Sequence, residues 1–296
     1  MNTSLPPIRL IAIDIDGTLL NAKKQIAPRT LEAILAARDA GMIITLATAR
    51  RYYNTAHIAS ELNIEIPLIL YDGALIMNHP AGTVVATTPL AAEVAQQAVE
   101  VLVRHKVQPV VHHMNGSTEE LWTGTKELDN DWVAGYFATV PNEIVRLPYE
   151  SCCIGWPDPL RVVAFTSEET VYELIPEISS LHCSWNITKR GSYNTAELAV
   201  MNPQCSKASG VRTLAERLAI PLEQVMAIGD NYNDIEMLRA AGLGVAMGQG
   251  PDEVKAAAQA VTGSNEEDGV AQAIEHYALS RRPRTDSNSI NRAICL

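Results

Sequence analysis

The stretch LIAIDIDGTLL, residues 10–20, places two carboxylates at the end of an apolar run. The run is typical of a buried strand, but Asp14 interrupts it and Asp16 follows two residues later. Residues i and i+2 of a strand point to the same face, so the two carboxylates are expected side by side. Repulsion and desolvation make both ionised forms costly in that position. A compensating group is therefore expected beside this pair.

Around this stretch, apolar segments alternate with amphipathic ones. Strands are expected at residues 10–14, 42–48 and 67–71, with helices at 28–41 and 51–63 between them. Continuous apolar strands separated by amphipathic helices indicate a parallel sheet that is covered on both faces. The same alternation returns after residue 207. The pattern predicts an α/β fold whose core is a doubly wound, mostly parallel, Rossmann-like sheet.

The middle of the chain has a different rhythm. A hairpin is expected at residues 74–88, and short strands separated by helical or loop-like pieces follow it. We expect an α+β cap domain inserted over residues 82–200, and a discontinuous core domain made of residues 1–81 and 201–278. The tail, residues 279–296, has no periodicity and is expected to be poorly ordered.

Charge and cysteine content exclude several classes of protein. The 296 residues carry 23 basic and 34 acidic side chains, a net charge of −11, which argues against a nucleic-acid surface. No apolar run reaches about 18 residues, so no membrane span is expected, and the N-terminal segment does not resemble a signal peptide. The five cysteines are odd in number and lack metal-binding spacing. They indicate reduced thiols in a cytoplasm; the oligomeric state stays open.

Polar side chains follow the ends of separate apolar strands. Asp14 and Asp16 end the first strand, Thr48 the second, Asp72 the third, and Asp230 the strand at residues 225–230. Ligands of an open parallel sheet bind at the carboxyl ends of its strands. The set therefore predicts one common site.

A divalent cation would solve the problem of the paired carboxylates. Mg²⁺, held by one or two carboxylates and by substrate phosphate oxygens, would neutralise Asp14 and Asp16, with a further oxygen from Asp230. Other groups at the same edge are suited to hold an anion: Lys207, Thr48 and the backbone N–H groups near Gly17 and Thr18. Phosphoryl transfer needs this combination of metal, cation and donors.

Four segments resemble the motifs of the haloacid dehalogenase-like phosphohydrolases. They are DIDGTL at 14–19, TLATAR at 45–50, Lys207 within PQCSKASGV, and GDNYNDIEML at 229–238. Their order, with a large insert between the second and third motifs, resembles the Cof-type branch of sugar-phosphate and cofactor phosphatases. The motifs span most of the core, whereas the insert matches only in size and position.

The resemblance implies a role for each motif residue in turnover. Asp14 is implied as the nucleophile, which forms an aspartyl-phosphate. Asp16 is implied as the acid that protonates the leaving oxygen and then as the base that activates water. Thr48, Lys207 and Asn233 are implied to hold the phosphoryl group.

The resemblance also implies a metal site. Its Mg²⁺ ligands are the Asp14 side chain, the Asp16 backbone carbonyl and Asp230. Asp234 is implied to brace these ligands, because groups behind a metal site orient the residues that bind it.

Two residues depart from the family pattern. Ala49 stands where this branch often has Gly, and Asp72 stands where Asn is usual. Asp72 would place a negative charge beside an anionic substrate. We expect Asp72 to pair with Arg50; the alternative is that it caps the turn that follows it.

The insert carries adjacent histidines and several tryptophans, two features that can indicate a site. His112 and His113 are neighbours, and neighbours on a strand face opposite ways, so a structural or substrate-edge role is expected rather than a metal. All four tryptophans also lie in the insert, at positions 122, 132, 156 and 185. Core packing is expected for them, and the alternative is that one lines a substrate pocket.

The resulting hypothesis is a Mg²⁺-dependent phosphatase acting on a small phosphorylated metabolite. The substrate would be a sugar phosphate or a phosphorylated cofactor or nucleotide. One alternative is a phosphohexomutase-like enzyme, which transfers the phosphoryl group to a second hydroxyl. Another is a catalytically silent regulator that binds metal and phosphate, against which the intact Asp14 and Asp16 count. No motif marks the cap residues that set specificity.

Overall fold

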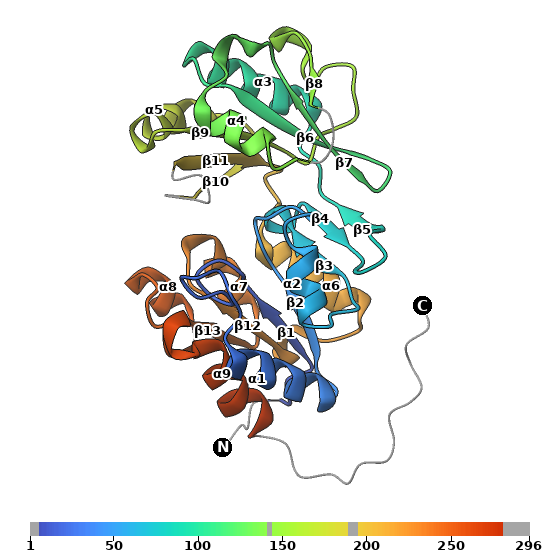
Figure 1. Ribbon diagram of the computed structural model, residues 1–296, viewed down its shortest axis with the longest axis vertical. Helices are drawn as coiled ribbons and strands as arrows, with labels where there is room; N and C mark the ends of the chain where they lie inside the picture. Colours follow the sequence, from blue (N-terminus) through green and yellow to red (C-terminus); the bar gives the residue numbers. More distant parts are fainter. Residues whose placement is uncertain (1–5, 141–143, 189–194, 281–296) are drawn as a thin grey trace.

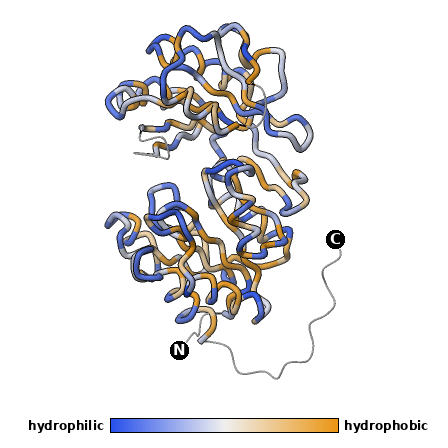
Figure 2. Tube along the Cα trace, viewed as in Figure 1, coloured by the Kyte–Doolittle hydropathy of each residue, from blue (hydrophilic) through white to orange (hydrophobic). Residues whose placement is uncertain are grey.

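The computed structural model describes residues 6–140, 144–188 and 195–280. Figure 1 shows two lobes, a lower one built from both ends of the chain and an upper one built from its middle. Hydrophobic residues follow the strands inside both lobes, as Figure 2 shows. The expected tail, residues 279–296, lies almost wholly outside the described residues. No helix in the described ranges is long and apolar enough to cross a membrane.

The lower lobe contains a five-stranded sheet whose strand pairs are all parallel. Its strands, in spatial order, are β14 (Ala260–Val261), β13 (Leu243–Ala246), β12 (Val225–Gly229), β1 (Leu10–Ile13) and β2 (Ile43–Leu46). The central strands β1, β12 and β13 are buried along their whole length, which accounts for their uninterrupted apolar sequences.

Helices cover both faces of this sheet, as expected for a doubly wound fold. The helices of the lower lobe are α1 (Pro28–Asp39), α2 (Ala56–Glu61), α6 (Lys207–Arg217), α7 (Ile235–Ala240), α8 (Asp252–Ala257) and α9 (Gly269–Ala273). Ile11 and Ile13 of β1 pack in one cluster with α1 and α9. Leu10 and Ala12 point the other way and pack in a cluster with α6, α7 and α8. The predicted α/β architecture is confirmed.

The hairpin expected at 74–88 forms and extends the lower lobe. Strand β3 (Leu68–Leu70) lies beside β2 through a parallel bridge between Ala47 and Ile69. It continues into an antiparallel sheet with β4 (Leu75–Met77) and β5 (Val84–Thr87). Because β5 pairs with β4, we propose that the inserted domain begins after β5 rather than at residue 82.

The upper lobe is a six-stranded sheet, antiparallel except for the pairing of β7 with β8. Its strands, in spatial order, are β10 (Ser184–Thr188), β11 (Ala196–Met201), β9 (Arg161–Thr166), β6 (Pro109–Asn115), β7 (Thr118–Thr123) and β8 (Val145–Arg146). Helices α3 (Ala92–Arg104) and α5 (Glu168–Ile178) pack on one face of this sheet. Helix α4 (Asp131–Phe137) covers part of the other face. The rest of that face borders the cavity between the lobes.

Three sequence expectations about the insert have different outcomes. His112 and His113 do face opposite ways: His112 lies between the hydroxyls of Tyr71 and Tyr136, whereas His113 packs on Trp122. Core packing holds for Trp122 but is wrong for the tryptophans at 132, 156 and 185, which are 37%, 47% and 38% exposed. No tryptophan is among the described residues that line the cavity between the lobes.

The helix expected at 51–63 is shorter than predicted. Helix α2 spans only Ala56–Glu61, and the preceding residues form turns. The carboxylate of Glu119, from the cap strand β7, accepts the backbone N–H of Tyr52 at 2.9 Å. This long-range contact ties the segment to the cap, and Arg51 and Tyr52 border the cavity.

Candidate active site

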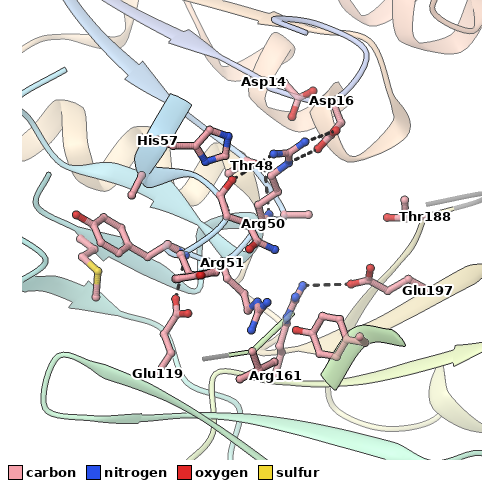
Figure 3. A pocket seen from close by; sticks show the side chains of 18 of the residues that line it. Asp14, Asp16, Thr48, Arg50, Arg51, His57, Glu119, Arg161, Thr188 and Glu197 are labelled. Carbon is pink, nitrogen blue, oxygen red and sulfur yellow. Dashed lines mark hydrogen bonds and ion pairs between the residues drawn. The ribbon is translucent and has the colours of Figure 1, made fainter. Parts of the chain in front are cut away.

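The residues that follow β1, β2 and β12 meet at one edge of the sheet, as predicted. They line a cavity of about 1290 Å³ between the two lobes, together with Lys207 at the start of α6. The predicted site residues that border this cavity are Asp14, Asp16, Thr48, Arg50, Lys207 and Asn233. Figure 3 shows the first four of them around one end of the cavity.

Asp14 is buried at the end of β1 and is bound to a buried ammonium group. Lys207 Nζ donates to Asp14 Oδ1 at 2.6 Å and to Asp234 Oδ1 at 2.7 Å. Burial alone favours the neutral amine, but the charges of Asp14 and Asp234 raise the pKa of Lys207. Burial raises the pKa of Asp14, and Lys207 opposes that rise. The site therefore keeps one permanent positive charge between two buried carboxyl groups.

Three carboxylates form a cluster that is suited to a divalent cation. Oxygen atoms of Asp14, Asp230 and Asp234 all lie within 4.8 Å of one another. Burial raises the pKa of Asp230 to about 6, although a 2.8 Å hydrogen bond from Thr18 Oγ1 opposes the rise. Gly17 has φ +88°, and a Cβ at this position would lie 2.4 Å from Asp230 Oδ2. Only glycine allows the backbone to pass this close to the cluster.

Asp234 holds the loop that follows β12. Its Oδ2 accepts the backbone N–H groups of Asp230 and Asn231, each at 3.0 Å. A Cβ on Gly229 would lie 2.4 Å from Asp234 Cγ, so glycine is required beside this carboxylate. Asn231 caps the short helix after it by accepting the N–H of Tyr232. The loop geometry thus depends on one buried side chain.

Asp16 forms ion pairs with Arg50 and Lys24, and it is not part of the carboxylate cluster. Arg50 Nε donates to Asp16 Oδ2 at 2.6 Å, and Arg50 Nη2 donates to Asp16 Oδ1 at 2.7 Å (Figure 3). Lys24 Nζ lies 3.2 Å from Asp16 Oδ1. Burial favours the neutral acid, but Arg50 and Lys24 outweigh it and lower the pKa of Asp16. The compensation expected for the paired carboxylates is therefore divided, with Lys207 beside Asp14 and Arg50 beside Asp16.

The expected pairing of Asp72 with Arg50 is wrong. The guanidinium fork of Arg50 is occupied by Asp16, and bidentate pairs of this kind are strong. The buried Asp72 instead accepts from Asn233 Nδ2 at 2.9 Å and from Asn186 Nδ2, in the cap strand β10, at 3.4 Å. Neither hydrogen bond caps the following turn, so the alternative expectation is not met either.

Thr48 completes this end of the cavity. It is buried where β2 ends, and its Oγ1 accepts the backbone N–H of Arg50 at 3.2 Å. Thr48 and Lys207 approach the cavity from different elements, one after β2 and one at the start of α6. Together they supply a hydroxyl and a cation at the edge where Asp14 lies.

A family model for the haloacid dehalogenase-like hydrolases matches residues 11–274 of the chain. The chain belongs to this family. A pyridoxal phosphate phosphatase of Escherichia coli, YbhA, is 30% identical over 92% of this chain and 99% of its own length. A phosphatase of Bacillus subtilis, YitU, named for 5-amino-6-(5-phospho-D-ribitylamino)uracil, is 29% identical over 90% of this chain and 97% of its own.

A solved structure leads to the same conclusion about this hydrolase. The sugar phosphatase BT4131, of subclass IIB, superposes with a TM-score of 0.75 at 26% identity, over 92% of this chain and 99% of that one. The family model, the relatives named as phosphatases and this structure together establish the hydrolase as a phosphatase.

Five charged residues of the cavity were not predicted from the sequence of this hydrolase. They are Lys24, Arg51, Glu119, Arg161 and Glu197. Arg161 and Glu197 stand in the apolar runs LRVVAF and ELAVM. A charge inside an apolar strand is the signal that singled out Asp14, and the same signal was present here.

Proposed function

We propose that this phosphatase hydrolyses a small phosphomonoester through an aspartyl-phosphate on Asp14. The observation that carries the proposal is the position of the buried Asp14 carboxylate. It lies at the end of β1 that borders the cavity, and its Oδ1 is 2.6 Å from Lys207 Nζ. A carboxylate held beside a permanent cation is suited to attack a phosphoryl group, because the cation also attracts the phosphoryl oxygens.

The first half-reaction uses the residues at the sheet edge. An Asp14 oxygen attacks phosphorus while the bond from phosphorus to the leaving oxygen breaks. Asp16 gives its proton to that oxygen, which departs as an alcohol. Lys207, Thr48 and Asn233 bind the phosphoryl oxygens and stabilise the charge that spreads over them.

The second half-reaction regenerates the enzyme. Asp16, now a carboxylate, takes a proton from water, and the water oxygen attacks the phosphorus of the aspartyl-phosphate. The bond between phosphorus and Asp14 breaks and inorganic phosphate leaves. Arg50 favours the charged form of Asp16 that this step needs, and it must release Asp16 for the first step.

The carboxylate cluster fits a Mg²⁺ ion. The Asp14 side chain, the Asp16 backbone carbonyl and Asp230 would hold it, and Asp234 would keep the Asp230 loop in place. The fit rests on hard oxygen ligands whose burial makes their charges costly without a cation. When bound, the ion supplies charge neutralisation between Asp14 and the substrate phosphate.

The substrate class is a sugar phosphate or a phosphorylated cofactor or nucleotide. The relatives named for pyridoxal phosphate and for a ribitylamino-uracil phosphate, and the sugar phosphatase structure, support this range. We also propose that the enzyme works in a reducing cytoplasm, because Cys152, Cys153 and Cys205 are buried free thiols.

Phosphate release from such a panel, with Mg²⁺ present, tests the proposal. Asp14→Asn should lower turnover of every substrate by about 10⁴-fold or more, because an amide cannot form the acyl-phosphate. Acid-quenched wild-type enzyme should carry phosphate from a ³²P-labelled substrate, and Asp14→Asn should carry none. Asp252→Asn, at an exposed surface carboxylate, is the matched control. Turnover near the wild-type level in pure Asp14→Asn would exclude this mechanism.

A further inference from the structure

The cap side of the cavity contains two buried arginines with unsatisfied N–H groups. Arg51 and Arg161 are each 3% exposed. Arg51 Nε, Arg161 Nε and Arg161 Nη1 have no hydrogen-bond partner within the described part of the chain. A buried charged donor without an acceptor is costly, so these groups need a reason to be where they are.

Aromatic rings hold both guanidinium groups in place. Arg161 Cζ lies 4.5 Å from the ring centroid of Tyr71, and Arg51 Cζ lies 5.0 Å from that of Tyr136. Arg51 Nη2 also donates to Thr139 Oγ1 at 3.1 Å. Stacking uses the faces of the guanidinium groups and leaves N–H groups at their edges for other partners.

A carboxylate lies beside Arg161 without a hydrogen bond to it, so a ligand atom at the side of the pair can contact both. Glu197 Oε1 is 3.7 Å from Arg161 Nη1, which is an ion-pair distance and too long for a hydrogen bond. Both side chains leave the same face of the cap sheet, from β9 and β11, and border the cavity. Figure 3 shows them across the cavity from Asp14 and Asp16. A phosphoester bound at Asp14 would extend its leaving group toward this pair.

The local charges favour a neutral polar group over an anion. Around the two arginines stand three carboxylates, Glu119, Glu197 and Asp72, whose charges act on Arg161 or its neighbours. A second anionic group on the substrate would meet Glu197 as well as Arg161. An apolar leaving group would leave the arginine donors unpaired. A hydroxyl satisfies both partners, because it accepts one hydrogen bond and donates another.

We propose that Arg161 and Glu197 bind a hydroxyl of the leaving group, with Arg161 donating to its oxygen and Glu197 accepting its proton in a hydrogen bond. The preferred substrates are then phosphomonoesters of uncharged polyhydroxy compounds. This inference rests on the proposed phosphatase mechanism and adds a specificity-determining pair to it.

The test compares leaving groups that differ in hydroxyl content and charge. The substrates are aldose phosphates of four to six carbons, pentyl phosphate, 3-phosphoglycerate and p-nitrophenyl phosphate. The wild-type enzyme should have a higher kcat/KM for the best aldose phosphate than for pentyl phosphate. In Glu197→Leu, which removes the acceptor, and in Arg161→Met, which removes the donor, the ratio of these two values should fall about 10- to 100-fold, the effect of a lost hydrogen bond in a buried site.

The matched control is Arg104→Met, on the outer surface of the cap, where Arg104 pairs with Glu177. Its substrate ratio should stay within about twofold of wild type. A structural role for the pair would lower all substrates together and leave the ratio unchanged. If Arg161→Met does not fold, as judged by thermal melting, Glu197→Leu decides the question.

Three results would overturn the inference. One is an unchanged ratio in Glu197→Leu. Another is a preference for 3-phosphoglycerate that rises in Glu197→Leu, which would assign the arginines to an anionic group. The third is hydrolysis of p-nitrophenyl phosphate without hydrolysis of any aldose phosphate. In all three cases, loss of p-nitrophenyl phosphate hydrolysis in Asp14→Asn would still support the proposed phosphatase mechanism. Failure of the specificity pair can therefore be distinguished from failure of that mechanism.

Discussion

Arg50 donates two hydrogen bonds to the carboxylate of Asp16, at 2.6 and 2.7 Å. A third, from Arg50 Nη1 to the carbonyl of Asn54 at 3.2 Å, fixes the guanidinium group in this orientation. The pair lowers the pKa of Asp16 against the effect of burial. An acid catalyst needs the opposite shift, so release of Asp16 by Arg50 belongs to the proposed first half-reaction.

Arg50→Gln should move the basic limb of the pH profile for an alkyl phosphate to higher pH. Asp16 must be protonated to act as an acid, and activity therefore falls as pH rises through its pKa. Without Arg50 that pKa is higher, so the fall occurs later. Single-turnover formation of the phosphoenzyme from an alkyl phosphate, measured between pH 5 and 9, tests the shift. Arg38→Gln, which loses a bond to the Leu62 carbonyl far from the cavity, is the control.

The same measurement with p-nitrophenyl phosphate provides an internal comparison. Nitrophenolate leaves without a proton, so its profile should not have a limb that depends on Asp16. A limb that moves equally for both substrates, or that does not move for the alkyl phosphate, would contradict the role proposed for Asp16.

Removal of divalent metal should abolish phosphate release, and Mg²⁺ should restore it. Asp230→Asn should weaken Mg²⁺ binding by at least about tenfold, because one oxygen ligand is lost while the Thr18 contact can persist. Thermal melting measures this without activity, since a bound ion raises the Tm. The rise with Mg²⁺ should be smaller in the variant. Full activity in excess chelator would rule out the metal.

Asp72→Asn should lower KM for a dianionic substrate about three- to tenfold, with kcat within twofold of wild type. The amide oxygen of Asn still accepts from Asn233, while the negative charge near the phosphate is gone. A partly screened like charge is worth about 1 kcal/mol here. Asp72→Ala loses the acceptor as well, so its KM should not fall. A lower KM in both variants, or in neither, would show that Asp72 does not position Asn233.

The stability of the cap should fall as pH decreases below about 6.5. Burial lowers the pKa of His113 from 6.5 to about 4, and it lowers that of His112 well below 6.5. Between these values the unfolded chain binds protons that the folded cap does not, so the free energy of unfolding decreases as pH falls. Tryptophan fluorescence during urea unfolding reports this, because all four tryptophans lie in the cap.

His113→Phe keeps a ring against Trp122 but removes one titrating group. Its loss of stability from pH 6.5 to 5 should be smaller than that of wild type. Equal losses in the two proteins would show that His113 does not carry this pH dependence.

The fold could be predicted from alternation alone, because buried parallel strands leave long apolar runs such as residues 10–13. The position of the site followed from the polar residues at the strand ends. The direction of each side chain did not follow. Arg50 and Asp72 follow the ends of neighbouring strands, but Arg50 binds Asp16. Asp72 instead accepts hydrogen bonds from the side-chain amides of Asn233, just before α7, and of Asn186, in the cap. The direction of such a side chain depends on partners that are far away in the sequence.

The helix expected at 51–63 is also shorter than its local sequence indicates. Residues 51–55 form turns or bends, and the N–H of Tyr52 binds Glu119, 67 residues later in the sequence. The place of Arg161 and Glu197 at the cavity was not predicted for a different reason. Arg161 and Glu197 stand alone in apolar strands of an insert that no motif marks, and only the assembled sheet brings them to one cavity.

The two faces of the cap sheet have separate duties, and this has a consequence for how such enzymes diverge. Along β11, Leu198 and Val200 pack under the helices of the cap, while Glu197 points to the cavity. Strand β9 sorts its residues in the same way, with Val162 inside and Arg161 toward the cavity. Further along the same face, Val163, Phe165 and Ala199 pack against α4, so the positions open to change are those that border the cavity, Arg161 and Glu197 among them. A duplicated copy of the gene can acquire a new substrate by such substitutions while its phosphoryl-transfer machinery, on the other lobe, is inherited intact.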